Sequence, residues 1–153
     1  MIKQAESNTP QIQTDGCLFL TLLKFAEDYT NQQFTKEEID IAYNYAIPTY
    51  MKDDRHDYAD RCFVLDHGAI IELGLRMLGI RSPKAQYLFR RDGEDQKIGS
   101  VMDIWRCNFY AARIKLPTFS HFYQSDQSGA MVWNPGISIN DKITSIRGYK
   151  IVL

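Results

Sequence analysis

Cys17 is the residue of this sequence whose type and position first indicate chemistry. It ends the stretch QIQTDGC, residues 11–17, and the strongly apolar run LFLTLLKFAED follows it directly. A cysteine in the first turn of a helix meets unpaired backbone N–H groups and the positive end of the helix dipole, which lower the pKa of its thiol. The thiolate is the nucleophilic form. The position therefore indicates a nucleophile, with a small buried side chain as the alternative.

A nucleophilic cysteine also needs a histidine, and the sequence offers His56, His67 and His121. His56 lies in a highly charged segment, and His67 lies near an expected helix start. His121 lies inside an expected strand, where neighbouring side chains can fix the orientation of its ring. We therefore expect His121 to be the partner of Cys17, with a purely structural histidine as the alternative.

The imidazole of a catalytic histidine is usually oriented by an Asn, an Asp or a backbone carbonyl. Asn134 lies on the strand expected to pair with that of His121. A four-residue loop over 126–129 would place Ser125 opposite Ala130 and His121 directly opposite Asn134, with their Cβ atoms about 4.5–5.5 Å apart. A loop one residue longer or shorter would turn Asn134 to the other face of the sheet. The hairpin thus predicts that His121 and Asn134 meet.

The elements that must position these residues can be read from periodicity. Apolar residues recur at three- and four-residue steps from 17 to about 28, and the helix is apolar nearly all round, as in a central core helix. Thr35 and Glu38 have capping-box spacing, which predicts a helix from about 36 to 47 that ends at Pro48. A third helix is expected within 65–80, with Asp66 as its cap and Gly79 in the left-handed conformation after its last turn.

The second half of the sequence predicts a sheet. Strands are expected at 85–91, 118–124, 130–135 and 144–153, while 101–116 is ambiguous and leans towards strand. The polar segment 50–61 is expected to be a solvated loop or a frayed helix. Helices followed by an antiparallel sheet indicate an α+β fold in two layers, with the N-terminal helices packed on the C-terminal sheet.

Composition limits the classes of function. A length of 153 residues indicates a single domain, expected over 11–153, after a loosely held lead-in over 1–10. A net charge of −1 argues against general binding to nucleic acid, and the lack of a long apolar run argues against a membrane span. Cys17, Cys62 and Cys107 have neither disulfide nor zinc spacing, so a cytoplasmic protein without metal or cofactor is expected, in which Cys62 and Cys107 are core thiols.

The order Cys17, His121, Asn134, with Gln11 six residues before the cysteine, resembles the papain-like cysteine peptidases. The pieces QIQTDGCLFL, SHFYQ, SDQSG and VWNP are similar to the peptidase C39-like branch of that superfamily. The segments GCLFLTLLKFAE, FTKEEID, CFVLDHGAI and HFYQSDQSGAMVWNP resemble, in order, those of DUF261, a small family carried by phages and plasmids. This likeness covers nearly the whole chain. Asn134 stands where Asp is usual in these families, and FS precedes the histidine in place of the common Gly-Gly or Gly-His.

The resemblance implies a papain-like fold and a cysteine hydrolase that cleaves a peptide or an isopeptide-like amide. It assigns Cys17 as nucleophile, His121 as general base and acid, and Asn134 as the residue that holds the imidazole. Gln11 and the backbone N–H of Cys17 would form the oxyanion hole, although Gln13 lies close enough to compete. Two alternatives remain: a non-catalytic protein-binding module encoded by a mobile element, and acyl transfer by the same residues.

Overall fold

The computed structural model describes the chain except residues 56–57, 93–95, 116–119, 137–141 and 153. Its helical elements are η1 (Gln4–Glu6), α1 (Pro10–Asp15), α2 (Cys17–Thr30), α3 (Lys36–Tyr50), α4 (His67–Met77) and α5 (Val101–Arg106). Its strands are β1 (Met51–Arg55), β2 (Tyr58–Val64), β3 (Lys84–Asp92), β4 (Gln96–Ile98), β5 (Phe109–Lys115), β6 (Ser120–Ser125), β7 (Met131–Trp133) and β8 (Ile143–Val152).

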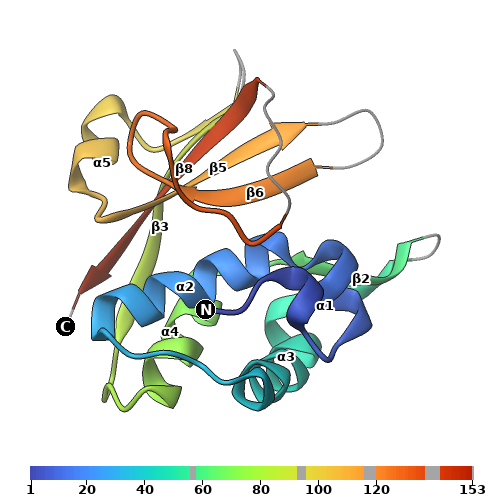
Figure 1. The fold of residues 1–153 in the computed structure, drawn as a ribbon. Coiled ribbons are helices and arrows are strands. Elements are labelled where there is room, and N and C mark those ends of the chain that lie inside the picture. Colours follow the sequence, from blue (N-terminus) through green and yellow to red (C-terminus); the bar gives the residue numbers. More distant parts are fainter. Residues whose placement is uncertain (56–57, 93–95, 116–119, 137–141, 153) are drawn as a thin grey trace.

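The chain forms two layers, as predicted for an α+β fold. Helices α1 to α4 make one layer, and a six-stranded antiparallel sheet in the order β4-β3-β8-β5-β6-β7 makes the other (Figure 1). β8, the last strand, lies in the middle of the sheet between β3 and β5. The end of the chain therefore completes the surface on which the helices pack.

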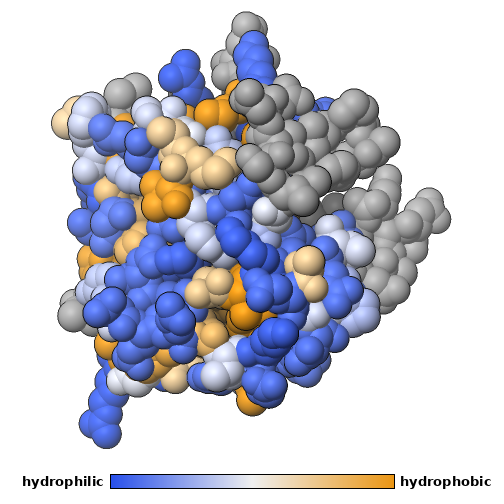
Figure 2. All heavy atoms as spheres, in the orientation of Figure 1, coloured by the Kyte–Doolittle hydropathy of each residue, from blue (hydrophilic) through white to orange (hydrophobic). Residues whose placement is uncertain are grey.

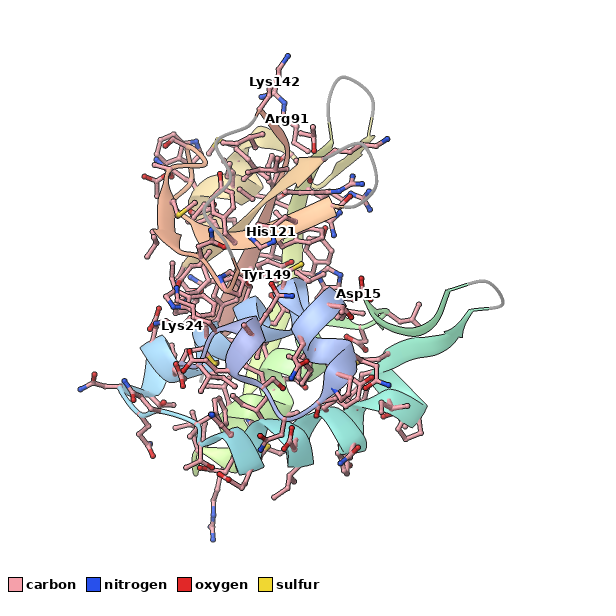
Figure 3. All side chains as sticks on the ribbon, turned by 45° about the vertical axis from the view of Figure 1, so that its right-hand side comes forward. Asp15, Lys24, Arg91, His121, Lys142 and Tyr149 are labelled. Carbon is pink, nitrogen blue, oxygen red and sulfur yellow. The ribbon has the colours of Figure 1, made fainter. Side chains whose placement is uncertain are left out.

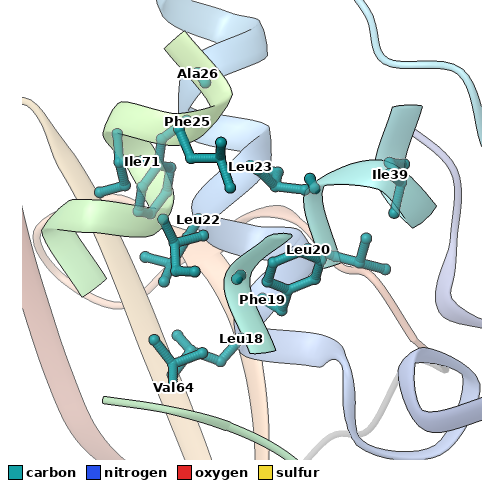
Figure 4. Close-up of a cluster of buried hydrophobic side chains, with 14 of the residues drawn as sticks. Leu18, Phe19, Leu20, Leu22, Leu23, Phe25, Ala26, Ile39, Val64 and Ile71 are labelled. Atoms are coloured by element: carbon teal, nitrogen blue, oxygen red, sulfur yellow. The ribbon is translucent and has the colours of Figure 1, made fainter. Parts of the chain in front are cut away.

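Helix α2 lies at the centre of the molecule. Its side chains are buried on nearly every side, as expected for a helix that is apolar all round (Figure 4). Towards the sheet, the ring of Phe25 lies 5.1 Å from that of Phe109 and 5.3 Å from that of Tyr149. Towards α4, Ala26 packs against Gly74, where an added Cβ would come within 3.0 Å. The helix that carries Cys17 is thus fixed by both layers.

The predicted helix signals of α3 and α4 are confirmed. Thr35 and Glu38 form the capping box of α3, and the Asp66 carboxylate accepts the N–H of Ala69 at the start of α4. Gly79 follows α4 with a φ of 94°. The prediction that Pro48 ends α3 is wrong, because the helix continues to Tyr50 with Pro48 in its last turn. Proline has a helical φ, although it lacks the N–H and crowds the carbonyl four residues before it, and here only two residues of helix follow it.

The segment 50–61, expected to be a solvated loop or a frayed helix, instead contributes to an antiparallel hairpin. Strand β1 pairs with β2 from Met51 opposite Val64 to Arg55 opposite Tyr58, with a bulge between Lys52 and Asp54. Met51 and Val64, which begin the pairing, are buried. The polar composition of this segment gives no sign of β1, because the pairing of a strand depends also on its partner segment. His56 and the side chain of Cys62 lie outside the described part of the structure.

Residues 1–10, expected to be a loosely held lead-in, make specific contacts. The Gln4 backbone N–H donates to the carbonyl of Pro135 at 2.7 Å, and the side chains of Gln4 and Ser7 are buried. The ammonium of Lys3 lies 4.9 Å from the centre of the Trp133 ring. These partners are over 120 residues away in the sequence, so local composition does not reveal them.

The ambiguous segment 101–116 contains both element types. α5 begins with a capping box between Ser100 and Asp103, and β5 begins at Phe109. The prediction of a strand was therefore right only for the second half of the segment 101–116. The Ser-x-x-Asp pattern was the missed signal. The sequence DGED, residues 92–95, has the composition of a turn, and all of it except Asp92 lies outside the described residues.

The outer surface is mostly hydrophilic on the face shown in Figure 2, with apolar side chains in small groups. Within the described residues, no helix has both the length and the apolar character that crossing a bilayer requires.

Candidate active site

Cys17 is the first residue of α2, directly after its N-cap Gly16. Its side chain is 7 % exposed, and its sulfur accepts a hydrogen bond from the backbone N–H of Phe122 at 3.4 Å. Gly16 lets α1 turn into α2, because an added Cβ there would lie 2.6 Å from the Cα of Ile12. The helix start therefore places the thiol against the backbone of β6 at Phe122, the residue after His121.

His121 lies near the beginning of β6 and is bonded to Asn134. Its Nε2 lies 2.6 Å from Oδ1 of Asn134, which also accepts the backbone N–H of Gly136 at 3.0 Å. A backbone N–H cannot donate to an amide NH2, so the second bond identifies this atom of Asn134 as the oxygen. Nε2 must then carry a proton. In the neutral ring, Nδ1 is left with its lone pair and can act as a base.

The predicted register of the β6–β7 hairpin is wrong, yet its two key side chains meet. Gln124 pairs with Trp133 and Ser125 with Met131, with a bulge between them, so Ser125 does not pair with Ala130. The bulge and the one-residue slip together shift the register by two residues. Since side chains alternate with a period of two, this even shift keeps Asn134 on the face predicted for it.

The hydrogen bonds of Cys17 and His121 go to different partners. The hydrogen bond of the sulfur goes to the Phe122 backbone and that of the imidazole goes to Asn134. Since Phe122 directly follows His121 in β6, the sulfur contacts the backbone of this strand one residue after the histidine. Figure 3 shows His121 between the sheet and the helical layer, above Asp15 near the start of α2.

Burial sets the electrostatics of this pair. It raises the pKa of the Cys17 thiol to about 11, against the smaller opposing effect of the Phe122 and Leu18 N–H groups. Burial also lowers the pKa of His121, which the hydrogen bond to Asn134 partly offsets. The expectation that the helix terminus lowers the thiol pKa is thus reversed, because desolvation outweighs the dipole. Both shifts favour a neutral thiol beside a neutral imidazole.

Gln11 lies in α1 and is half-buried, and its assignment to an oxyanion hole stays a prediction. The side chain of its competitor Gln13 donates to the carbonyl of Ser7 at 2.7 Å. Gln4, which the sequence did not single out, lies near the imidazole, because a Cβ added at Gly136 would be 2.8 Å from Oε1 of Gln4 and 2.8 Å from Cε1 of His121. No local signal marks Gln4, because the fold alone brings it there.

The remaining candidates serve other roles. His67 lies at the start of α4, where its Nδ1 bonds to the Tyr149 hydroxyl at 2.8 Å. Cys107 is buried, as predicted for a core thiol, and its thiol donates to the Asp103 carbonyl.

A pocket of about 460 Å³ opens beside Trp133 and polar residues of α2, and neither Cys17 nor His121 lines it. The described residues hold no group of three metal-ligating side chains.

Comparisons with protein-family models, curated proteins and solved structures find no match to this chain. Conclusions about function therefore depend on the geometry of the site itself.

Replacing Asn134 with aspartate, Asn134→Asp, should raise the pKa of His121. A carboxylate in hydrogen-bond contact with Nε2 stabilises the imidazolium, and an opposite charge at this distance shifts a pKa by about 1 to 3 pH units. The shift can be measured by NMR titration of the His121 Cε1–H signal. Asn108→Asp adds the same charge beside Ile151 and is the matched control. An unchanged pKa in Asn134→Asp would show that Nε2 does not face this residue.

Proposed function

We propose that this protein is a cysteine hydrolase that cleaves a peptide or isopeptide-like amide. The observation that carries the proposal is the 2.6 Å bond between His121 and Asn134 beside a cysteine whose sulfur contacts the next residue of the same strand. A nucleophile, a base and a residue that orients the base are the three parts that such catalysis requires.

The reaction begins from a neutral pair, so the proton moves during the attack. As the Cys17 sulfur bonds to the carbonyl carbon, Nδ1 of His121 takes the thiol proton, and Asn134 holds the imidazolium through Nε2–H. The imidazolium then gives its proton to the leaving amine as the C–N bond breaks, which leaves a thioester on Cys17. Water attacks the thioester with His121 again as base, and the acid and the free thiol are released.

The tetrahedral intermediate carries a negative oxygen that needs hydrogen-bond donors. The backbone N–H of Cys17 lies in the first turn of α2, where N–H groups have no partner within the helix. In this proposal the Gln11 side chain is the second donor. One such donor contributes on the order of 3 kcal/mol to the rate of acyl transfer.

An acylation experiment tests the proposal. Incubation with p-nitrophenyl acetate should add an acetyl group to the peptide that contains Cys17, and mass spectrometry should detect it as a thioester released by hydroxylamine. His121→Ala should slow acylation by roughly 100-fold or more, because general base catalysis typically contributes that much. Cys107→Ala, which removes another buried thiol, should leave the rate unchanged.

Two results would argue against the hydrolase. One is acylation of Cys107 in preference to Cys17, and the other is an unchanged rate in His121→Ala. Amide hydrolysis itself is then tested with a fluorogenic peptide mixture in the wild type and in Cys17→Ala. An added amine that captures the acyl group faster than water does would assign acyl transfer to the same residues.

A non-catalytic protein-binding module is the second candidate. The observation that favours it is the burial of the thiol together with its raised pKa, since a purely structural cysteine has the same properties. Under this reading, Cys17→Ser keeps partner binding intact, and no acyl adduct forms on the wild-type protein.

A further inference from the structure

The N-terminal segment is bonded to the turn that carries Asn134. This residue directly follows Trp133, the last residue of β7, so it lies just beyond the pairing of β7 with β6. The ammonium of Lys3 donates a hydrogen bond to the carbonyl of Asn134. The backbone N–H of Gln4 donates to the next carbonyl, that of Pro135, at 2.7 Å. Two successive carbonyls of the turn are thus bonded to two successive residues of the N-terminal segment.

Gln4 also connects this turn to the segment before Cys17. Its side chain is 8 % exposed, and its Nε2–H donates to the carbonyl of Ile12 in α1 at 3.2 Å. The same carbonyl accepts the backbone N–H of Gly16, the residue before Cys17, at 3.0 Å. Gln4 is therefore a bridge from the turn after β7, through one shared carbonyl, to the start of α2.

The other end of the Gln4 amide lies near the imidazole. A carbonyl only accepts hydrogen bonds, so the bond to Ile12 identifies the nitrogen of the amide, and its oxygen is the atom on the side of Gly136. Oε1 of Gln4 and Cε1 of His121 each lie 2.8 Å from the position that a Cβ on Gly136 would take, so they are at most twice that distance apart. The backbone N–H of Gly136 in turn donates to Oδ1 of Asn134. Gln4, the ring and the turn therefore pack as one unit.

We propose that Gln4 and Lys3 are positioning residues, which hold Asn134 where its side chain orients the imidazole of His121. The inference rests on the proposed function, since it assigns both residues to the same site. A ring that takes the thiol proton through Nδ1 must be held through Nε2, and a misplacement of about 1 Å can slow a reaction roughly 100-fold. The bond of 2.6 Å between Nε2 and Oδ1 depends on the backbone position of Asn134, to which Lys3 and Gln4 are bonded.

NMR of the His121 ring N–H tests the positioning directly. In the wild type the Nε2–H donates to Asn134, so it should exchange slowly with water. Gln4→Leu removes both polar ends of one side chain, and Lys3→Met removes the ammonium that bonds to the turn. We expect the Nε2–H to exchange roughly tenfold faster in each variant, because the loss of about one hydrogen bond shifts an opening equilibrium by that factor. Lys3 is exposed, so Lys3→Met remains informative if Gln4→Leu does not fold.

The acylation rate of Cys17 shows whether the position matters for the reaction. With p-nitrophenyl acetate, this rate should fall roughly tenfold or more in Gln4→Leu and in Lys3→Met. Lys3→Arg should retain the wild-type rate, because a guanidinium can donate to the same carbonyl. Gln32→Leu is the matched control, since Gln32 also donates from its side-chain amide to a backbone carbonyl, that of Leu78, at 3.0 Å and beyond the far end of α2. Its ring N–H exchange and its acylation rate should equal those of the wild type.

Three results would overturn the positioning role. They are unchanged exchange of the ring N–H in Gln4→Leu and Lys3→Met, equally fast exchange in Gln32→Leu, or wild-type acylation in the variants whose ring N–H exchanges faster. Failure of the hydrolase would look different, because Cys17 would then not be acylated in the wild type. The NMR comparison would still decide whether Gln4 and Lys3 hold the ring.

Discussion

Acid should destabilise this protein mainly through His67. Burial lowers the pKa of its imidazole from 6.5 to about 3, and the positive charges of Arg147 and Arg90 add to this effect. His67 is therefore neutral in the folded state and binds a proton more readily when the chain is unfolded. Stability from this group is complete above pH 6.5 and is lost as the pH falls towards 3. The free energy of unfolding should fall by about 3 kcal/mol between pH 7 and pH 4 from this group alone.

Urea unfolding at both pH values measures the effect, and His67→Gln isolates it. The glutamine does not titrate and can still bond to the Tyr149 hydroxyl, so its stability should depend less on pH by most of that amount. His121→Gln is the matched control, because burial lowers the pKa of His121 without the arginines. An equal loss of stability in His67→Gln and the wild type, or a His67 NMR signal that titrates near pH 6.5, would contradict the prediction.

Alkylation of Cys17 by iodoacetamide should be slow at neutral pH. Only the thiolate reacts, and a pKa of about 11 in place of 9.0 reduces the thiolate fraction at pH 7. The rate should therefore be about 100-fold below that of an unperturbed thiol, before any effect of restricted access. It should also rise tenfold per pH unit through pH 10.

The double variant C62A C107A confines the reaction to one thiol, and the same protein unfolded in urea gives the reference rate. A plateau of the rate between pH 6 and pH 8 that disappears in His121→Ala would mean that a thiolate–imidazolium pair already exists at rest. In that case the proton transfer proposed for the attack would precede substrate binding.

Sequence patterns within a few residues predicted the structure well. Thr35 with Glu38, Asp66 and Gly79 mark helix ends through hydrogen bonds and backbone angles that each segment makes with itself. The apolar run after Cys17 likewise predicted a central helix, because a helix without a polar face can only be buried. The α+β architecture followed from the order of these elements.

Features that depend on distant partners were not predictable in the same way. The β1–β2 hairpin was hidden by its charged residues, and the packing of Gln4 against Pro135 depends on the far end of the chain. The contact between His121 and Asn134 was predicted from a wrong register of the β6–β7 hairpin. The observed register differs by two residues, which leaves both side chains on the same face of the sheet, so the contact still forms. The predicted direction of the shift in the Cys17 pKa was wrong, because burial is a property of the whole fold.

The candidate site also has an order of assembly. The contact between Cys17 and Phe122 spans 105 residues, and the bond from the Lys3 ammonium to the Asn134 carbonyl spans 131. During translation, helix α2 leaves the ribosome before β6 and β7 are made, so Cys17 then lacks the strand that buries its sulfur. Until β6 has folded against α2, the Cys17 thiol therefore keeps the lower pKa of an exposed cysteine and is open to alkylation or oxidation, from which the completed fold protects it.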